Sequence, residues 1–137
     1  MTAAPKSRKP TVLVVDDEAT VRSLTRRMLE EHGYSVIEAG DGFDALNLLE
    51  SKGEHIELVI TDVVMPRLDG LELARSVEVM PHPPPILLMS GWGLSALEFE
   101  RPFLVKPFQS HELLAAVHGL LKAPGQEDQR SSDAAPS

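Results

Sequence analysis

Residues 11–20, TVLVVDDEAT, place an apolar run directly before three acidic side chains. Apolar runs of this kind are typical of a strand that is covered on both faces. The acidic residues 16–18 then stand where this strand leaves the core. Clustered carboxylates are costly, since two unit charges about 4 Å apart repel by roughly 4 kcal/mol at an effective dielectric of 20. The stretch therefore predicts a buried strand that ends at a site for a positive charge.

The rest of the chain alternates between predicted strands and predicted helices. Strands are expected at residues 11–16, 34–39, 56–62, 85–90 and 102–106, and helices at 18–33, 41–53, 69–80 and 110–122, the last with Ser110 as N-cap. This alternation predicts βαβ units and an α/β fold with a parallel sheet that helices cover on both faces. Between Ser90 and Lys106 only one or two helical turns fit besides a loop and a strand, so the fourth helix is expected to be short or irregular.

Composition narrows the class of protein. The chain has 137 residues, which suits one domain, and no cysteine, which excludes disulfides and thiolate chemistry. No apolar run reaches the roughly 20 residues of a membrane span, and no signal peptide is recognisable, so a cytoplasmic protein is expected. The net charge of −8 combines +3 in residues 1–10 and −2 in residues 123–137 with −9 in residues 11–122. A body this acidic repels phosphates, which disfavours nucleic acid as a partner.

Polar residues stand at the carboxyl ends of four predicted strands: Asp16 and Asp17, Asp62, Ser90, and Lys106. Ligands of open parallel sheets bind beyond these ends, so the five side chains are expected to converge. Mg²⁺ prefers carboxylate and carbonyl oxygens and accepts a phosphoryl oxygen as a further ligand. A carboxylate is also a nucleophile toward phosphorus, and a metal, an ammonium and a hydroxyl neutralise the charge that develops on the transferred group. The pattern predicts magnesium-dependent phosphoryl chemistry.

Four motifs carry a resemblance to a known family: VLVVDDE at residues 12–18, LVITDVVMPRLDGLEL at 58–73, ILLMSG at 86–91 and FLVKPF at 103–108. In this order they resemble the receiver domain of bacterial two-component response regulators. The resemblance implies a flavodoxin-like (βα)5 fold, doubly wound, with five parallel strands in the order 2-1-3-4-5. It covers residues 11–122, the expected receiver domain. The composition of the two ends, rich in Ala, Pro, Ser and charge, predicts a disordered basic leader at residues 1–10 and a disordered tail at 123–137.

The resemblance also implies a role for each site residue. Asp62 is the expected phosphoacceptor. Mg²⁺, with Mn²⁺ as an alternative, is the expected cofactor, held by Asp17 directly, by Asp62, by Asp16 largely through water, and by the backbone carbonyl of Val64. These assignments make the acidic cluster a metal site.

The remaining expected roles concern the phosphoryl group and the switch. Lys106 is expected to bind a phosphoryl oxygen, and its peptide bond to Pro107 is expected to be cis. Ser90 is the expected switch hydroxyl, and Phe103 stands where the family places a rotating aromatic, although it could equally be a core residue. Pro66 and Gly70 are expected to shape the loop after Asp62.

The implied function is a phosphorylation-dependent signalling switch. A sensor histidine kinase or a histidine phosphotransfer protein is the expected donor, and the altered surface is expected to signal to a downstream protein. The protein is expected to be a phosphoacceptor that catalyses its own phosphorylation and dephosphorylation, with no other enzymatic activity. The 15 residues after position 122 leave no room for an output domain, so a single-domain protein is expected.

Three alternatives remain open at this stage. A phosphatase that resembles haloacid dehalogenase-like hydrolases would share the Mg²⁺, lysine and hydroxyl, but its two aspartates stand two residues apart, whereas Asp16 and Asp17 are adjacent. A flavodoxin-like FMN module would share the fold, but its first loop is not acidic. A receiver whose site is intact but unused would act as a phosphate-independent adaptor.

Overall fold

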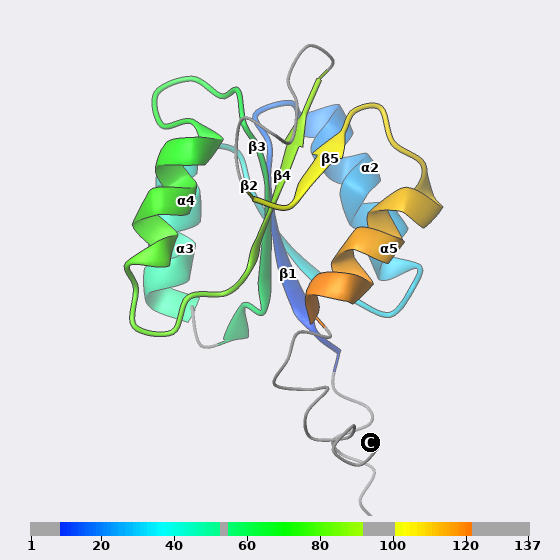
Figure 1. Ribbon diagram of the computed structural model, residues 1–137, viewed down its shortest axis with the longest axis horizontal. Coiled ribbons are helices and arrows are strands. Elements are labelled where there is room, and N and C mark those ends of the chain that lie inside the picture. Colours follow the sequence, from blue (N-terminus) through cyan, green and yellow to red (C-terminus); the bar gives the residue numbers. More distant parts are fainter. Residues whose placement is uncertain (1–8, 53–54, 92–100, 122–137) are drawn as a thin grey trace, which may run out of the picture.

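The computed structural model describes residues 9–52, 55–91 and 101–121, and within them strands and helices alternate (Figure 1). The strands are β1 (Thr11–Val15), β2 (Ser35–Ala39), β3 (Leu58–Asp62), β4 (Ile86–Ser90) and β5 (Phe103–Val105). The helices are α2 (Ala19–Glu30), α3 (Gly42–Lys52), α4 (Gly70–Glu78) and α5 (Ser110–Leu121). The expected fourth helix, between β4 and β5, falls largely on residues 92–100, which lie outside the described part of the chain, as do residues 1–8 and 122–137.

The five strands form one parallel sheet in the order β2-β1-β3-β4-β5. Strand β1 pairs with both β2 and β3, with Val14 opposite Glu38 on one side and Ile60 on the other. The chain crosses from β2 past β1 to reach β3, and this reversal places a crevice at the carboxyl ends of β1 and β3. The predicted fold and strand order are confirmed.

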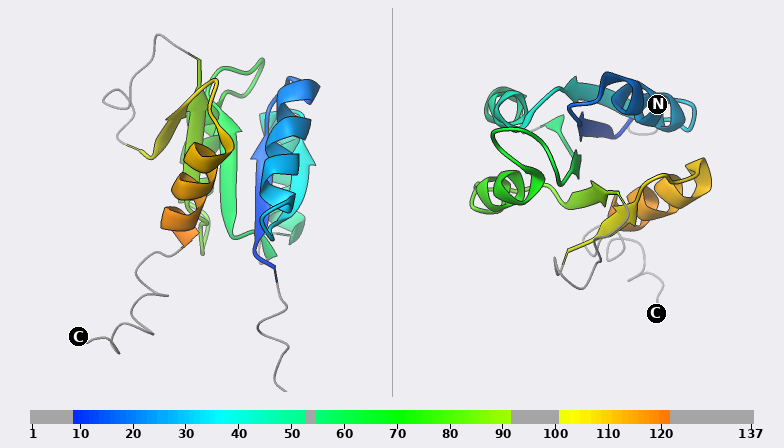
Figure 2. Two further views of the ribbon diagram at one scale, coloured as in Figure 1. Left: turned by 90° about the vertical axis from the view of Figure 1, so that its right-hand side faces the viewer. Right: turned by 90° about the horizontal axis from the view of Figure 1, so that it is seen from above.

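Helices cover both faces of the sheet (Figure 2). Successive residues of β1 point to opposite faces: Leu13 and Val15 pack with α3 and α4, whereas Val12 and Val14 pack with α2 and α5. All four are fully buried. Burial on both faces explains why β1 is a continuous apolar run rather than an alternating one.

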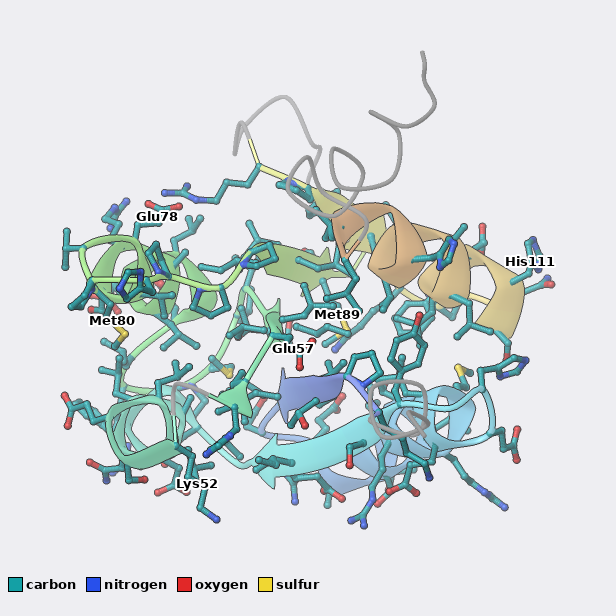
Figure 3. The ribbon with its side chains drawn as sticks, turned by 90° about the horizontal axis from the view of Figure 1, so that it is seen from below. Lys52, Glu57, Glu78, Met80, Met89 and His111 are labelled. Carbon is teal, nitrogen blue, oxygen red and sulfur yellow. The ribbon has the colours of Figure 1, made fainter. Side chains whose placement is uncertain are left out.

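Seen from below, the two helical layers flank the sheet, with Met89 of β4 between them and Lys52, Glu78 and His111 at the periphery (Figure 3). Met89 is fully buried, in the cluster that α2 and α5 cover. No helix within the described ranges is long and apolar enough to cross a membrane. The interior is therefore one sheet between two helix layers.

Several elements begin or end one or two residues away from the predicted position. β1 ends at Val15 rather than at Asp16. The last helix begins with Ser110 itself, so the prediction that Ser110 is its N-cap is wrong. The capping contact comes instead from Glu112, whose side chain accepts a hydrogen bond of 2.7 Å from the backbone N–H of Gln109. At α4 the Asp69 and Glu72 side chains each accept the other's backbone N–H at 2.9 Å, which is a complete capping box.

Candidate functional site: an acidic pocket at the carboxyl edge of the sheet

The predicted site residues meet at the carboxyl edge of the sheet. Asp62 and Ser90 are the last residues of β3 and β4, while Asp16 and Lys106 directly follow β1 and β5. The four strands are neighbours in the sheet, so their ends bring together side chains that are up to 90 positions apart in sequence. Asp16 is fully buried, and Asp62 and Ser90 are 7% and 1% exposed. Asp16, Asp62 and Ser90 are thus buried polar residues at the edge of the core.

The Lys106 ammonium bridges two carboxylates. Its Nζ donates to Asp16 Oδ2 at 3.0 Å and to Asp62 Oδ2 at 3.1 Å. Burial opposes the positive charge, but the hydrogen bonds and negative charges of the two aspartates outweigh it and raise the pKa of Lys106. An ion pair at this depth is costly to form and more costly to break, because either partner left alone is a buried, unpaired charge.

Asp16 is held by its own turn as well as by Lys106. Its Oδ1 accepts the backbone N–H of Glu18 at 2.9 Å, and its backbone carbonyl accepts Arg22 Nη1 at 2.7 Å. The Arg22 Nε in turn donates to Glu38 Oε1 at 2.8 Å, in strand β2. Asp16 is therefore both a local turn former and a member of the pocket.

Asp62 differs from an ordinary surface aspartate in its affinity for a proton. Burial raises the pKa of its carboxyl above the usual value, Lys106 opposes this effect, and the negative charge of Asp16 adds to it. Its Oδ1 also accepts the backbone N–H of Val64 at 3.4 Å, a long contact. The contacts of Asp62 therefore do not fully offset the cost of burying its negative charge. A further positive charge nearby would stabilise the ionised carboxylate.

The carboxylates of Asp16, Asp17 and Asp62 lie close enough together to hold a metal ion. One oxygen from each lies within 4.8 Å of the others, and among the described residues this is the one such group of three or more possible metal-ligating side chains. Asp17 is exposed, whereas Asp16 is fully buried. Oxygen-only donors of this charge fit Mg²⁺, which keeps several of its waters. The acidic cluster is typical of the magnesium site of a receiver domain.

The remaining predicted residues differ in their surroundings. Ser90 Oγ donates to the carbonyl of Gly91 at 3.3 Å. The Lys106–Pro107 peptide bond is cis, the isomer that the resemblance implies. Phe103 is partly buried and packs against the cluster that α3 and α4 cover, and the side chain of Val64 is 67% exposed.

Sequence reasoning did not single out Arg22, Asp41 or Arg67. Arg22 contacts the Asp16 backbone, and Arg67 forms an ion pair with Asp41 beside the loop that follows Asp62. Arg22 also pairs with Glu38, 16 positions away, and Arg67 lies 26 positions from Asp41, so local sequence patterns do not indicate these pairs. Arg67 does stand out in the sequence, because it lies inside the motif at residues 58–73, but the motif does not indicate which residue it pairs with.

Comparison with known proteins agrees with this geometry. The family model for the response regulator receiver domain matches residues 12–118. The response regulator MprA of Mycobacterium avium is 39% identical over 129 residues, which cover 88% of this chain and 55% of MprA, so the chain spans little more than half of that relative's length.

Solved structures give the same result. The chemotaxis protein CheY4 of Vibrio cholerae has a TM-score of 0.76 and 28% identity, covering 82% of this chain and 99% of CheY4. The receiver domain of the Francisella response regulator 1452 has a TM-score of 0.74 and 28% identity, covering 83% and 98%. With its fold, its acidic pocket and its bridging lysine, the chain belongs to the response regulator receiver domain family.

Proposed function

We propose that this protein is a phosphorylation-dependent signalling switch in which Asp62 accepts a phosphoryl group from a histidine kinase or a histidine phosphotransfer protein. The observation that carries the proposal is the Lys106 ammonium, which lies within 3.1 Å of both Asp16 and Asp62 inside a cluster of three carboxylates. Three negative charges and one positive charge leave a local excess of negative charge. Such a site favours a divalent cation together with the phosphoryl group that the cation brings.

Each residue has a definite task in the proposed transfer. A carboxylate oxygen of Asp62 attacks phosphorus, the bond from phosphorus to the donor's imidazole nitrogen breaks, and that nitrogen keeps the electron pair. Lys106 supplies a positive charge for a phosphoryl oxygen, and the Ser90 hydroxyl can turn from the Gly91 carbonyl to donate to another. Relocation of Ser90, followed by Phe103, would carry the change to the surface that a downstream protein recognises.

Mg²⁺, when bound, neutralises charge on the transferred group and orients it for in-line attack. Asp17, Asp62 and the backbone carbonyl of Val64 are the proposed direct ligands, with Asp16 acting largely through water; Mn²⁺ offers the same coordination chemistry. The proposed location is the cytoplasm, where such donors act.

The proposal is tested by labelling with acetyl phosphate. The wild-type protein is expected to become phosphorylated only when Mg²⁺ is present, and Asp62→Ala is expected to lose the label entirely, because no other carboxylate stands at the end of β3. Asp44→Ala, which changes an exposed aspartate of α3, is the matched control and should label normally. Labelling that survives in Asp62→Ala, or that proceeds equally well in excess chelator, would contradict the proposal.

A second prediction concerns the metal and the stability of the fold. Mg²⁺ at 100 times its dissociation constant is expected to stabilise the folded protein by about 2.7 kcal/mol, because it binds the folded state preferentially. Asp17→Asn should weaken this response, yet raise the melting temperature of the metal-free protein by a few degrees, since it removes one of three crowded negative charges. Thermal melts with and without Mg²⁺ measure both effects.

Glu50→Gln provides the control for Asp17→Asn, since it neutralises an exposed acid of α3 outside the pocket. It should leave the response to Mg²⁺ unchanged. If metal-free Asp17→Asn melts below the wild type, the three carboxylates do not repel one another as proposed.

A further inference from the structure

The loop that carries Val64 joins β3 to α4, and backbone contacts fix both of its ends. At the start, the Val63 N–H donates to the Met89 carbonyl in β4 at 2.9 Å. At the end, the Gly70 N–H donates to the Val63 carbonyl at 2.9 Å, and the Asp69 capping box fixes the first turn of α4. No comparable backbone contact appears among the described residues for the middle of the loop, so its shape depends on side chains.

Arg67, in the middle of this loop, has a φ of 68° and is the one non-glycine residue with positive φ in the described ranges. Residues with a Cβ rarely adopt this left-handed conformation. Such a conformation persists where surrounding contacts over-determine it, and it is common at functional sites. The contacts of Arg67 therefore require an explanation.

Arg67 is held by the start of α3. Its Nη2 forms an ion pair with Asp41 Oδ2, and its guanidinium lies 5.5 Å from the ring centroid of Phe43, within range of a cation–π interaction. The next residue, Leu68, packs directly on Gly42, where an added Cβ would lie 2.7 Å from Leu68 Cδ2 and 2.8 Å from the Leu68 carbonyl oxygen. Arg67 and Leu68 thus contact Asp41, which directly precedes α3, and the first two residues of that helix.

Asp41 is itself held in place before it meets Arg67. Its Oδ1 accepts the backbone N–H of Asp44 at 2.8 Å, which leaves Oδ2 for the guanidinium. That backbone hydrogen bond, with the positive charge of Arg67, lowers the pKa of Asp41, so its carboxylate stays ionised at neutral pH. The side chain of Asp41 is only 18% exposed, against 63% for Arg67.

We propose that Arg67 and Asp41 form a positioning clamp that holds the β3–α4 loop in the shape that binds Mg²⁺. The inference rests on the proposed function, in which the Val64 carbonyl, three residues before Arg67, is a metal ligand. Groups that orient a ligand commonly matter for metal affinity nearly as much as the ligand itself. Within the described residues, Arg67 contacts Asp41 and Phe43 and none of the proposed metal ligands, so in this proposal it acts through the shape of the loop that carries Val64.

This role predicts a particular pattern of defects. Without the clamp, Arg67 can leave its left-handed conformation and the Val64 carbonyl moves with the loop. Mg²⁺ affinity is expected to fall about 10-fold, at the lower end of the effect of outer-shell partners. The rate of phosphorylation at saturating Mg²⁺ is expected to stay within about twofold of wild type, because Asp62, Lys106 and Ser90 are untouched.

The experiment compares Arg67→Ala, Asp41→Asn and the double variant. Asp41→Asn keeps an oxygen for the Asp44 N–H and removes only the ion pair. Calorimetric titration with Mg²⁺ should give the same loss of affinity in both single variants and no further loss in the double variant, since a coupled pair is not additive. Arg67→Lys should recover part of the affinity. Arg75→Ala, an exposed arginine on α4, is the matched control and should bind Mg²⁺ normally.

A second measurement needs no metal. Amide hydrogen exchange in residues 63–68 of the metal-free protein should quicken in Arg67→Ala and Asp41→Asn, but not in Arg75→Ala. Unchanged Mg²⁺ affinity in both single variants, or losses that add in the double variant, would overturn the clamp. A wild-type protein that binds no Mg²⁺ would overturn the proposed function and the clamp together, and this outcome is seen before any variant is made.

Discussion

Lys106→Met is expected to lower the free energy of unfolding of the metal-free protein by about 3 kcal/mol at neutral pH, the cost typical of removing one partner from a buried ion pair. Methionine keeps most of the apolar part of the side chain but leaves the carboxylates of Asp16 and Asp62 without their shared ammonium. Asp16 is fully buried and Asp62 is 7% exposed, so water cannot replace the lost charge. The loss is electrostatic rather than one of packing.

The stability of the Lys106→Met variant is expected to increase as the pH falls. The pKa of Asp62 is already raised by burial, and the loss of Lys106 raises it further. The folded variant then holds a proton that the unfolded chain has released, so its stability increases as the pH falls through the folded pKa of Asp62 toward the ordinary value of 3.8. Protonated Asp62 no longer repels Asp16. The difference between variant and wild type should therefore narrow on acidification.

The contribution of Lys106 to stability depends on pH with the same sign, but in a more alkaline range, because its pKa is also raised in the folded state. Because its folded pKa is raised, its stabilising effect is fully present below the ordinary value of 10.5 and disappears as the pH rises through the folded pKa. Urea denaturation from pH 5 to pH 8, within that range, measures the difference between the two proteins. Saturating Mg²⁺ should stabilise the variant more than the wild type, because the cation no longer competes with an ammonium for the same carboxylates.

Lys52→Met serves as the control, since Lys52 is an exposed lysine at the end of α3 that lies at the periphery of the molecule (Figure 3). It should change stability by less than about 0.5 kcal/mol, as is usual for surface substitutions. A Lys106→Met protein as stable as Lys52→Met at pH 7 would show that the two aspartates do not depend on the ammonium.

Much of the fold could be predicted because the strongest signals in the chain are local. The apolar run at residues 12–15 predicts a doubly covered strand, and polar residues at successive strand ends predict an edge where they meet. Both predictions are confirmed by the parallel sheet and by the Lys106 contacts with Asp16 and Asp62. Since the carboxyl ends of parallel strands share one edge, the topology alone brings these side chains together.

What could not be predicted depends on contacts between elements. Helical periodicity groups Phe43 with the apolar residues of α3, yet Phe43 is 49% exposed. Its ring lies 5.5 Å from the guanidinium of Arg67, which belongs to a loop 24 residues further along the chain. The sequence likewise gives no means of telling which carboxylate Lys106 prefers, and the structure shows that it bridges both. The preference of serine for the N-cap position also predicted the start of α5 one residue too late. In the structure Ser110 is already the first residue of the helix.

Gly70→Ala is expected to destabilise the protein by about 3 kcal/mol or more, at the upper end of the cost of overpacking a core. A Cβ on Gly70 would lie 2.2 Å from the carbonyl oxygen of Asp62 and 2.9 Å from the Cα of Val63. Both are backbone atoms, so no rotamer change can relieve the overlap. Either α4 or the end of β3 has to move, and the movement of β3 displaces the proposed phosphoacceptor.

Gly119→Ala is the matched control for this prediction, because the chain offers a second helical glycine with open space around it. Nothing lies within 4 Å of an added Cβ there, and alanine in a helix is favoured over glycine by about 1 kcal/mol. The same substitution should thus have opposite signs at the two positions, as measured by urea denaturation. If both variants are stabilised, α4 can retreat from the Asp62 carbonyl at little cost, and the loop that carries Val64 is not tied to the end of β3 as the close approach of Gly70 implies.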